Sequence, residues 1–428
     1  MSLLGPVKIL YVSQYFPPEM GAPAARAAEL SRYWTENGHE VTVLTGFPNH
    51  PTGVVPLEYR RKFRRLVTKE KVDGVNVVRT WLLPFPNRKA YERMLNYSSF
   101  FVSSASTGLF LSRPDVVIAT SPQLLVGFSG WWLARCKRVP FVFEVRDLWP
   151  ESLAAVGMGN QDSLLHRSLA RVAGFLYRNS ERVAVVTPAF KDYLVEHWHL
   201  PPTKIAVVQN GVDTELFSPQ ATNPNLRSKL GAEGKFVVSY IGTMGMAHAL
   251  DTLVEAADRL QESYPEILFL LVGDGADKER IVSLARSRRL SNLRFVDQQP
   301  REKIPSYICA SDACLVLLKK TDLFKTVIPT KMLEFMSCAR PVILGVDGQA
   351  RKIVEEAQAG VFVEPENADD LAQAVSVLAG NQSLRESFGR NGRRHILQGY
   401  SRRQTAEAYI EVLEELAGNN RRRTKLAA

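Results

Sequence analysis

Short apolar runs rich in β-branched residues recur along the chain, and most of them are followed by a segment with helical spacing. The first run, Val7–Ser13, precedes a loop and a helical pattern over Ala24–Asn37. Further apolar runs follow in the first half at Val41–Thr45, Val75–Thr80, Asp115–Thr120, Phe141–Val145 and Val183–Thr187. Strands that alternate with helices predict βαβ units and a mostly parallel sheet.

A second series of strands begins after an irregular segment. Between Asn210 and Gly234, Asn-Gly, Ser-Pro and Asn-Pro pairs interrupt the periodicity, as is typical of a linker. The alternation then restarts at Lys235–Ile241, Ile267–Val272, Leu293–Val296, Ala313–Leu318 and Pro341–Leu344. We therefore predict an α/β protein with Rossmann-like domains at 1–209 and 210–398, followed by a helical C-terminal segment at 399–428.

The composition agrees with globular domains. The 428 residues are 45% hydrophobic and 23% charged, which excludes disorder, collagen and coiled coil as the main description. The four cysteines lie in apolar stretches without metal-ligand spacing: Cys136, Cys309, Cys314 and Cys338. We expect buried, reduced thiols, a cytoplasmic location and no metal site. No signal-peptide pattern is evident, and the charge-free run 94–111 is too polar to predict a membrane span, so a surface or core helix is expected.

The formal net charge of +10 is concentrated in two places. Residues 60–93 contain eleven Lys and Arg and three Asp and Glu, and the tail 421–425 adds four positive charges. Because the first cluster directly precedes the run 94–111, it resembles a contact with an anionic membrane, with a solvated basic face as the alternative. No nucleic-acid-binding motif accompanies the charge, so nucleic acid is not an expected partner.

Two strand-to-helix loops carry glycines where backbone amides could approach a phosphate. Gly21 lies in the first loop of the chain, and Gly242 with Thr243 follows the run Lys235–Ile241. Neither loop has the GxGxxG spacing of a dinucleotide site, and a turn glycine without a ligand is the alternative. Asp274 ends another strand, where it serves either as a turn former or as a ligand contact.

The segment Phe324–Ser337 is the most informative. Thr330 is expected as a helix N-cap, which puts Lys331 in the first turn and Glu334 one turn later. A cation in the first turn opposes the helix dipole, an arrangement that suits a bound anion. A diphosphate and a ribose diol would use these two side chains, whereas an exposed Lys–Glu pair on a helix surface is the alternative.

Charged residues also follow the run Phe141–Val145. Glu144, Arg146 and Asp147 lie at the expected carboxyl end of a parallel strand, where open α/β sheets bind ligands. An Arg–Asp pair beside an aromatic residue suits the hydroxyls and ring face of a sugar. A structural ion pair that braces the loop is the alternative.

Taken together, these segments resemble the family-four retaining GT-B glycosyltransferases. The resemblance rests on Lys8–Glu19, Glu144–Ser152, Asn210–Asp213, Gly273–Gly275 and Pro329–Glu334 with Arg340–Ile343. It extends over essentially the whole chain. Within the family, the chain is most similar to the branch of O-antigen and colanic-acid transferases that includes N-acetyl-L-fucosamine transferases.

The resemblance implies a fold and an activity. The fold would be GT-B, with two facing Rossmann-like domains and a C-terminal helix that returns to the first domain. The first domain would bind the acceptor, and the second would bind the nucleotide sugar. The activity would be metal-independent retaining transfer from a UDP-sugar, such as one carrying N-acetyl-L-fucosamine or a related N-acetyl sugar. The acceptor would be a polyprenyl-diphosphate-linked or other glycan at the inner face of the cell membrane, where the enzyme would be peripheral. The alternatives are a GDP-mannose-type transferase and a nucleotide-sugar epimerase of the same fold.

The resemblance also implies roles for individual residues. The donor-binding set would be Gly21, Asn210, Gly242, Thr243, Asp274, Lys325, Thr326, Lys331 and Glu334. Glu334 would hold the ribose, and Lys331 or Lys325 would face the diphosphate. The candidate catalytic residues are Asp147, Arg146 and Glu144, which would orient the acceptor or donor sugar.

The sequence departs from the family pattern at three places. Thr326 replaces the first carboxylate of the usual Glu, seven residues, Glu spacing. The Arg and Lys that often follow the Gly242-type strand are absent, with Thr243 and His248 nearby. A histidine common at a first-domain strand end is replaced by Thr120 or Arg146. We therefore expect the two lysines of Phe324–Ser337 to meet the diphosphate charge.

Overall fold

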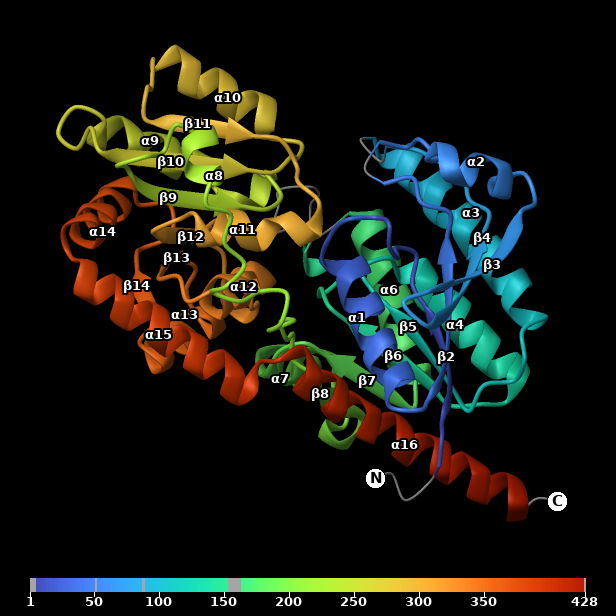
Figure 1. Cartoon of the computed structure of the whole chain (residues 1–428). Coiled ribbons are helices and arrows are strands. Elements are labelled where there is room, and N and C mark those ends of the chain that lie inside the picture. Colours follow the sequence, from blue (N-terminus) through green and yellow to red (C-terminus); the bar gives the residue numbers. More distant parts are fainter. Residues whose placement is uncertain (1–4, 51, 87–88, 153–162, 427–428) are drawn as a thin grey trace. The chain divides into compact units, whose positions relative to one another are not determined.

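The computed structural model describes residues 5–50, 52–86, 89–152 and 163–426, and the chain divides into two compact units (Figure 1). Unit 1 comprises residues 1–209 and 403–428, and unit 2 comprises residues 210–402. Each unit is built on its own sheet, and both sheets are mainly parallel. The carboxyl ends of the strands within a unit therefore meet at one edge of its sheet.

Unit 1 has an eight-stranded sheet in the order β3-β4-β2-β1-β5-β6-β7-β8. Its strands are β1 (Lys8–Val12), β2 (Glu40–Gly46), β3 (Val67–Val72), β4 (Val75–Thr80), β5 (Val116–Thr120), β6 (Phe141–Val145), β7 (Arg182–Val185) and β8 (Ile205–Val207). Every pair is parallel except β3 with β4. The predicted apolar runs all form strands. Two strands were not predicted, because β3 alternates with charged residues at an edge and β8 is only three residues long.

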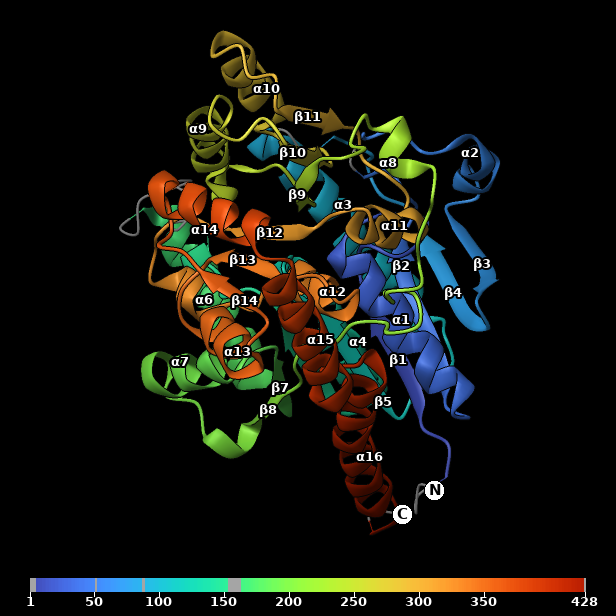
Figure 2. The same cartoon turned by 60° about the vertical axis from the view of Figure 1, so that its left-hand side comes forward.

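The helices of unit 1 include one from the far end of the chain. They are α1 (Ala22–Glu36), α2 (Leu57–Phe63), α3 (Ala90–Leu109), α4 (Leu124–Lys137), α6 (Leu164–Asn179), α7 (Pro188–Trp198) and α16 (Arg402–Leu426). The indole Nε1 of Trp34 donates to the carbonyl of Ala406 at 2.9 Å, and the Tyr409 ring meets the Trp34 ring edge-on at 5.4 Å. Figures 1 and 2 both show the end of α16 beside the start of β1, where Arg421 pairs with Asp115 at 2.6 Å. The C-terminal helix is thus part of the core of unit 1.

Unit 2 has a six-stranded, fully parallel sheet in the order β11-β10-β9-β12-β13-β14. Its strands are β9 (Phe236–Ile241), β10 (Ile267–Val272), β11 (Leu293–Val296), β12 (Ala313–Leu317), β13 (Val342–Gly345) and β14 (Gly360–Phe362). Its helices are α8 (Leu226–Lys229), α9 (Leu250–Leu260), α10 (Lys278–Ser287), α11 (Ile304–Cys309), α12 (Thr330–Ser337), α13 (Gln349–Ala357), α14 (Ala368–Gly380) and α15 (Gln382–Gly399). Successive residues of β9 enter two separate hydrophobic clusters, so helices cover both faces of the sheet.

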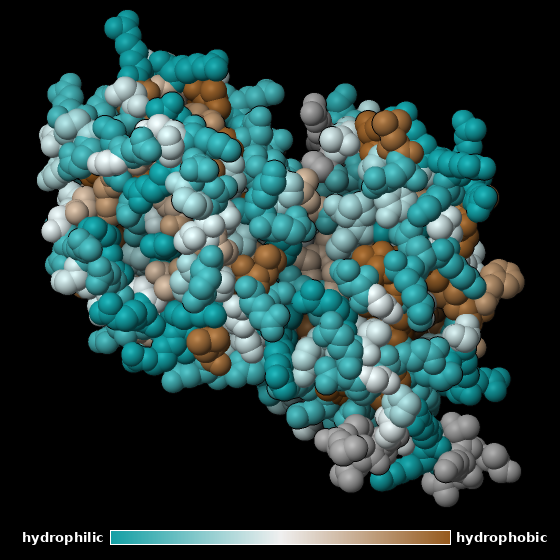
Figure 3. All heavy atoms as spheres, in the orientation of Figure 1, coloured by the Kyte–Doolittle hydropathy of each residue, from teal (hydrophilic) through white to brown (hydrophobic). Residues whose placement is uncertain are grey.

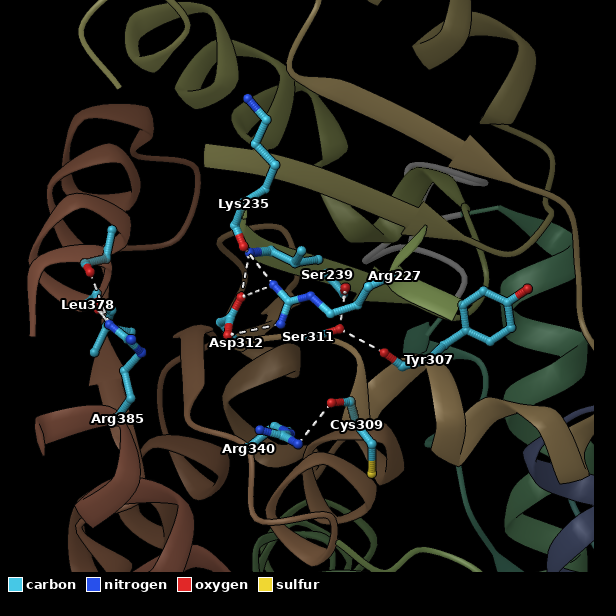
Figure 4. Close-up of polar contacts among 12 residues, drawn as sticks. Arg227, Lys235, Ser239, Tyr307, Cys309, Ser311, Asp312, Arg340, Leu378 and Arg385 are labelled. Carbon is cyan, nitrogen blue, oxygen red and sulfur yellow. Dashed lines mark hydrogen bonds and ion pairs between the residues drawn. The ribbon is translucent and has the colours of Figure 1, made fainter. Parts of the chain in front are cut away.

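Polar side chains brace the amino-terminal end of β9, away from the edge where the candidate site residues lie. Asp312 accepts hydrogen bonds from Arg227 at 2.9 Å and from the backbone N–H of Val237 at 2.8 Å (Figure 4). The hydroxyls of Ser239 and Ser311 are 2.5 Å apart. These contacts fix β9 against β12 and leave the opposite edge of the sheet for other groups.

The expectations for the cysteines and for the run 94–111 have mixed outcomes. Cys309, Cys314 and Cys338 are buried, but the prediction for Cys136 is wrong, because Cys136 lies on the exposed last turn of α4. Among the described residues, no group of three or more His, Cys, Asp or Glu could hold a metal ion.

The run 94–111 forms most of α3, which buries a polar face with Asn96 and Ser104. No helix in the described part of the chain is long and apolar enough to cross a membrane.

Candidate active site

Two strand-end loops of unit 2 touch through glycines. A Cβ atom on Gly273 would lie 2.0 Å from the carbonyl oxygen of Gly242, and one on Gly275 would lie 2.3 Å from that of Met244. The backbone N–H of Gly242 donates to Val272 at 2.9 Å, and that of Met244 donates to Asp274 at 2.8 Å. Since no larger residue fits at Gly273 or Gly275, these glycines hold the loops after β9 and β10 together at the carboxyl edge.

Lys331 lies against this pair of loops from the first turn of α12. Its Nζ donates to the Tyr240 hydroxyl at 2.9 Å and lies 4.1 Å from the centre of the Tyr240 ring. A Cβ atom on Gly242 would be only 3.0 Å from Nζ, so the glycine makes room for the ammonium. The structure shows no carboxylate within ion-pair distance of Lys331 in the residues that it describes. The ammonium is therefore held by a hydroxyl, a ring face and a glycine.

The surroundings shift the ionisation of Lys331 and of its neighbour His248. Burial lowers the pKa of Lys331 to about 7, although the charge of Glu334 acts in the opposite direction. Burial and the charge of Lys331 lower the pKa of His248 to about 3, so His248 is neutral at pH 7. A bound anion would favour the charged form of Lys331 and raise its pKa again.

Glu334 has a cationic partner that the sequence analysis missed. The Nη1 of Arg301 donates to Oε1 of Glu334 at 3.1 Å, and both side chains are largely buried. The Arg301 guanidinium also lies 4.9 Å from the centre of the Phe217 ring. Arg301 is on a short 3-10 helix, Arg301–Lys303, far from Glu334 in sequence and within no motif, so no sequence pattern pointed to it.

The structure separates the two candidate lysines. Lys325 is on the 3-10 helix Leu323–Thr326, and its Nζ pairs with Asp322 at 2.8 Å in an exposed position. The hydroxyl of Thr326 donates to the carbonyl of Leu323 at 2.6 Å. Lys331 lies beside Gly242, whereas Lys325 has an acidic partner of its own.

The remaining residues of the implied donor set lie mostly in turns. Asp274 is exposed, and its Oδ1 accepts from the N–H of Gly275 at 2.8 Å, as a turn former does. The carbonyl of Thr243 accepts from the Tyr240 hydroxyl at 2.5 Å. Asn210 is half-buried and is the first residue of unit 2. The prediction of Thr330 as the N-cap is wrong, because Pro329 occupies that position and Thr330 is the first helical residue.

Gly21 lies in unit 1 at the start of α1. It is the N-cap residue, with a φ of 130° that favours glycine, and its carbonyl accepts from the N–H of Ala25 at 3.0 Å. Gly21 is exposed, so the positive end of α1 is open to solvent in unit 1.

Glu144 is part of a buried network in unit 1. Arg26 donates to Oε1 of Glu144 at 2.9 Å, and the Tyr11 hydroxyl donates to Oε2 at 2.7 Å. The Glu144 side chain has no exposed surface, and that of Arg26 is 2% exposed. Burial alone would raise the pKa of Glu144, but the charges of Arg26 and Arg146 outweigh it and hold the pKa below its usual value. These contacts form the bracing ion pair, the alternative that the sequence had left open, and a role of Glu144 in orienting a sugar stays a prediction.

Arg146 and Asp147 follow β6 in a more open position. The backbone N–H of Arg146 donates to the hydroxyl of Ser121 at 2.7 Å. Its side-chain Nε and the indole nitrogen of Trp149 are buried and have no hydrogen-bond partner among the described residues. Asp147 is exposed. Two buried donors and a carboxylate thus lie at the carboxyl edge of unit 1, where the charges of Arg146 and Asp147 act on each other.

Comparisons with known proteins also divide the chain into two parts. Residues 21–211 match the family model "Glycosyl transferase 4-like domain", and residues 222–395 match "Glycosyl transferases group 1". The chain is 23% identical over 393 residues to WcaI of Escherichia coli, named as a colanic acid biosynthesis glycosyl transferase, with 86% of this chain and 91% of WcaI covered.

Solved structures share the fold. A sucrose-phosphate synthase from Thermosynechococcus elongatus has a TM-score of 0.71 at 20% identity, covering 98% of this chain and 99% of the synthase. The Anabaena protein HepE, solved in complex with UDP-glucose, also has a TM-score of 0.71, at 17% identity over 96% of this chain and all of HepE.

The two parallel-sheet Rossmann-like units, with α16 packed on the first, define a glycosyltransferase of the GT-B fold. Both family models point to the same family, one in each unit. The chain belongs to glycosyltransferase family 4, a retaining family that uses nucleotide sugars.

The buried pair of unit 1 generates a prediction about stability. Glu144→Gln removes the buried carboxylate that pairs with Arg26, so we expect the free energy of unfolding of unit 1 to fall by about 3 to 5 kcal/mol. The pKa of Glu144 is depressed in the folded state, so its stabilisation is present above about pH 4.5 and is lost as the pH falls through the folded-state pKa. Urea unfolding at several pH values, followed by calorimetry, measures both effects.

Glu407 provides a matched control, because it pairs with Arg403 at an exposed position. Glu407→Gln is expected to change stability by less than about 1 kcal/mol. Equal losses in the two variants would contradict the account of Glu144.

Proposed function

We propose that the protein transfers a sugar from a UDP-sugar held by unit 2 to a lipid-linked glycan held by unit 1, in the synthesis of a surface polysaccharide. The sugar is N-acetyl-L-fucosamine or a related N-acetyl sugar. The enzyme works in the cytoplasm at the inner face of the cell membrane and needs no metal. The observation that carries the donor part of the proposal is the ammonium of Lys331, which lies beside Gly242 with no carboxylate of its own in the described structure.

The donor assignment follows from the chemistry of Lys331 and Glu334. A diphosphate brings the negative charge that the ammonium lacks, and the N-terminus of α12 adds a positive dipole on the same side. One turn later, Glu334 offers carboxylate oxygens to the two hydroxyls of a ribose while Arg301 fixes the carboxylate. In this assignment Lys325 contributes long-range charge only, because Asp322 already pairs with it.

The same groups support the chemical step. In a retaining transfer of this family, charge develops on the leaving diphosphate as the sugar acquires oxocarbenium character. Lys331 and the first N–H groups of α12 stabilise that charge without reorganisation. Arg146 and Asp147 orient the acceptor or donor sugar from unit 1, and Gly21 presents the N-terminus of α1 to the donor phosphate.

Two relatives support the choice of donor and pathway. HepE was solved with UDP-glucose, and WcaI is named for colanic acid biosynthesis. Identities of 17% and 23% leave the transferred sugar and the acceptor to be tested directly.

A donor panel tests the proposed function. The purified full chain is incubated with UDP-, GDP- and ADP-sugars, with and without short polyprenyl-diphosphate-linked sugars, and release of the nucleoside diphosphate is measured. We expect release from a UDP-sugar that depends on the lipid-linked acceptor, because both partners must be bound for transfer.

Other outcomes of the panel support the alternatives. Turnover of GDP-mannose and of no UDP-sugar would move the assignment to a GDP-mannose-type transferase. Turnover without any acceptor would favour an epimerase or hydrolase. Release from no donor would contradict the proposed function as a whole.

The membrane part of the proposal rests on a mixed surface of unit 1, which we call the basic–apolar patch. It consists of Val54, Leu57, Tyr91, Met94 and Leu95 together with Arg61, Arg64, Arg65 and Lys89, all of them exposed. A Cβ atom on Gly53 would lie 2.3 Å from the backbone nitrogen of Pro86, so the segment before α2 lies beside the segment before α3. Figure 3 shows apolar atoms reaching the surface of unit 1 among hydrophilic ones.

Not all of the basic residues of 60–93 are available to a membrane. Arg79 is fully buried and pairs with Glu70 at 2.5 Å, and Lys62 pairs with the same carboxylate at 2.8 Å. The exposed arginines of α2 and of the turn that follows it retain their charge for an anionic surface. Each such cation adds about 1 kcal/mol of attraction to anionic lipid, and the exposed apolar side chains add insertion into the interface.

Charge reversal tests the patch. We expect the triple variant Arg61→Glu, Arg65→Glu, Lys89→Glu to bind vesicles that contain phosphatidylglycerol at least about 100-fold more weakly, because the loss of three attractive charges alone costs about 3 kcal/mol and the new charges are repulsive. Co-sedimentation with these vesicles measures the change, and titration with UDP is expected to give an unchanged affinity.

A matched triple charge-reversal variant on unit 2 distinguishes an effect of the basic–apolar patch from an effect of the net charge of the protein. Arg286→Glu, Arg289→Glu, Arg390→Glu changes the net charge equally at exposed positions. Equal weakening by both triple variants, or binding that does not respond to phosphatidylglycerol, would contradict the patch.

A further inference from the structure

A cavity of about 530 Å³ lies on one face of the unit 1 sheet, and we call it the β3 cavity. Residues of β1, β2, β3 and β4 line it, together with the segment 110–114 that follows α3. The hydroxyls of Thr80 and Thr107 are 3.1 Å apart, so α3 packs over the carboxyl half of this part of the sheet. The cavity lies beyond the end of α3, at the amino half of the same strands.

Two polar side chains of the cavity have no partner of their own. The strand register pairs Leu10 with Thr42 and Thr42 with Asn76, so these three side chains lie in a row on one face of the sheet. Thr42 and Asn76 are half-buried, and neither side chain forms a hydrogen bond with a residue that the structure describes. The hydroxyl and the amide can both donate a hydrogen bond to a ligand in the cavity.

The acidic side chains that line the cavity are neutralised by cations. They are Glu40 and Glu70. Glu40 pairs with Lys8 at 3.2 Å. Glu70 pairs with Arg79 at 2.5 Å and with Lys62 at 2.8 Å. Both carboxylates of the lining are therefore already matched by positive charge.

Three further cations line the cavity without an acidic partner among the described residues. Lys69 and Lys71 are exposed, and they lie on the same side of β3 because they are two residues apart. Arg113 donates from Nε and Nη2 to the carbonyls of Lys137 and Arg138, each at 3.0 Å, which positions its guanidinium without neutralising it. A cleft lined by charges of one sign concentrates counter-ions, so the β3 cavity is suited to an anion.

Apolar side chains lie beside the cavity at the end of α3. Phe110 lines the cavity and is 89% exposed, and Leu109 beside it is 42% exposed. Tyr91, Leu95, Val102 and Leu109 are spaced by four or seven residues, so they share one exposed face of α3. Because α3 has 20 residues and is about 30 Å long, this face connects the basic–apolar patch with the β3 cavity.

The surroundings of the cavity define a ligand with an anionic and an apolar part. Phosphate oxygens accept hydrogen bonds from Lys, Arg, hydroxyl and amide groups, all of which line the cavity. Inorganic phosphate would satisfy these groups but would leave Phe110 in water. A phospholipid carries its phosphate next to acyl chains, and basic side chains occur beside Phe and Leu where proteins lie in the membrane interface.

We infer that the β3 cavity binds the phosphate of an anionic phospholipid while Phe110 enters the acyl region beside it, an inference that rests on the proposed attachment of unit 1 to the membrane. The basic–apolar patch contacts the membrane near the start of α3, and the cavity holds a lipid near its end. Two contacts separated by the length of α3 fix the orientation of unit 1 on the membrane, which one contact alone does not.

Short-chain lipids test the inference without a bilayer. Dihexanoyl phosphatidylglycerol, dihexanoyl phosphatidylcholine and inorganic phosphate are titrated separately into the full chain, and ligand-observed NMR measures binding. We expect phosphatidylglycerol to bind several-fold more tightly than either of the others. Phosphatidylcholine carries a cation next to its phosphate, and inorganic phosphate lacks an apolar part.

Two variants examine the two parts of the ligand separately. The double variant Lys69→Gln, Lys71→Gln is expected to weaken phosphatidylglycerol binding roughly tenfold or more, because two charged donors are lost. Phe110→Ser is expected to weaken it several-fold and to leave the affinity for inorganic phosphate unchanged, because Phe110 contacts only the apolar part. Circular dichroism checks that both variants fold.

Lys229→Gln, Lys352→Gln is the matched control, because it removes two charges at exposed positions of unit 2. Three results would each overturn the inference: no binding of phosphatidylglycerol, binding of phosphatidylcholine or inorganic phosphate that is as tight, or equal loss in the two double variants. Co-sedimentation of the unchanged chain with phosphatidylglycerol vesicles and turnover of UDP-sugars show separately whether the proposed function stands.

Discussion

The contact of the Lys331 ammonium with the end of β9 is the interaction on which the proposed donor site depends. Nζ lies 2.9 Å from the Tyr240 hydroxyl and would lie 3.0 Å from a Cβ atom at Gly242. This approach requires a glycine at position 242, and the loop that carries it is held by the equally close packing of Gly273.

Charged groups have different surroundings in the core of unit 1 and at the carboxyl edge of the unit 2 sheet. In the core of unit 1, Glu144 and Arg26 neutralise each other, and every carboxylate oxygen of Glu144 has a donor. At the carboxyl edge of the unit 2 sheet, by contrast, Lys331 has no carboxylate within ion-pair distance among the residues that the structure describes. A polar group that is buried without a partner lowers the stability of the free protein. In our proposal Lys331 meets a ligand, whereas Glu144 and Arg26 hold the fold.

The elements that could be predicted are those that depend on residues close together in the sequence. The apolar runs predicted the central strands of both sheets, and the unusual position of Lys331 in a helical first turn led to the proposed donor site. Contacts between distant segments were not predictable in this way. Arg301 reaches Glu334, and Arg26 reaches Glu144, across 33 and 118 positions of sequence. The burial of Cys136 was wrongly predicted for the same reason, since the burial of a residue at the end of a helix depends on what packs over it.

Titration of the full chain with UDP across a range of pH tests the central claim about Lys331 most directly. In the unchanged protein, affinity for UDP is expected to fall as the pH rises above about 7, because Lys331 in the free protein then loses the proton that the diphosphate requires. Lys331→Arg is expected to remove this pH dependence, because arginine stays charged, and Lys331→Gln is expected to weaken binding roughly tenfold or more below that pH. Lys352→Gln, at an exposed position on α13, serves as the control. UDP binding by Lys331→Gln that equals that of the unchanged protein would contradict the account.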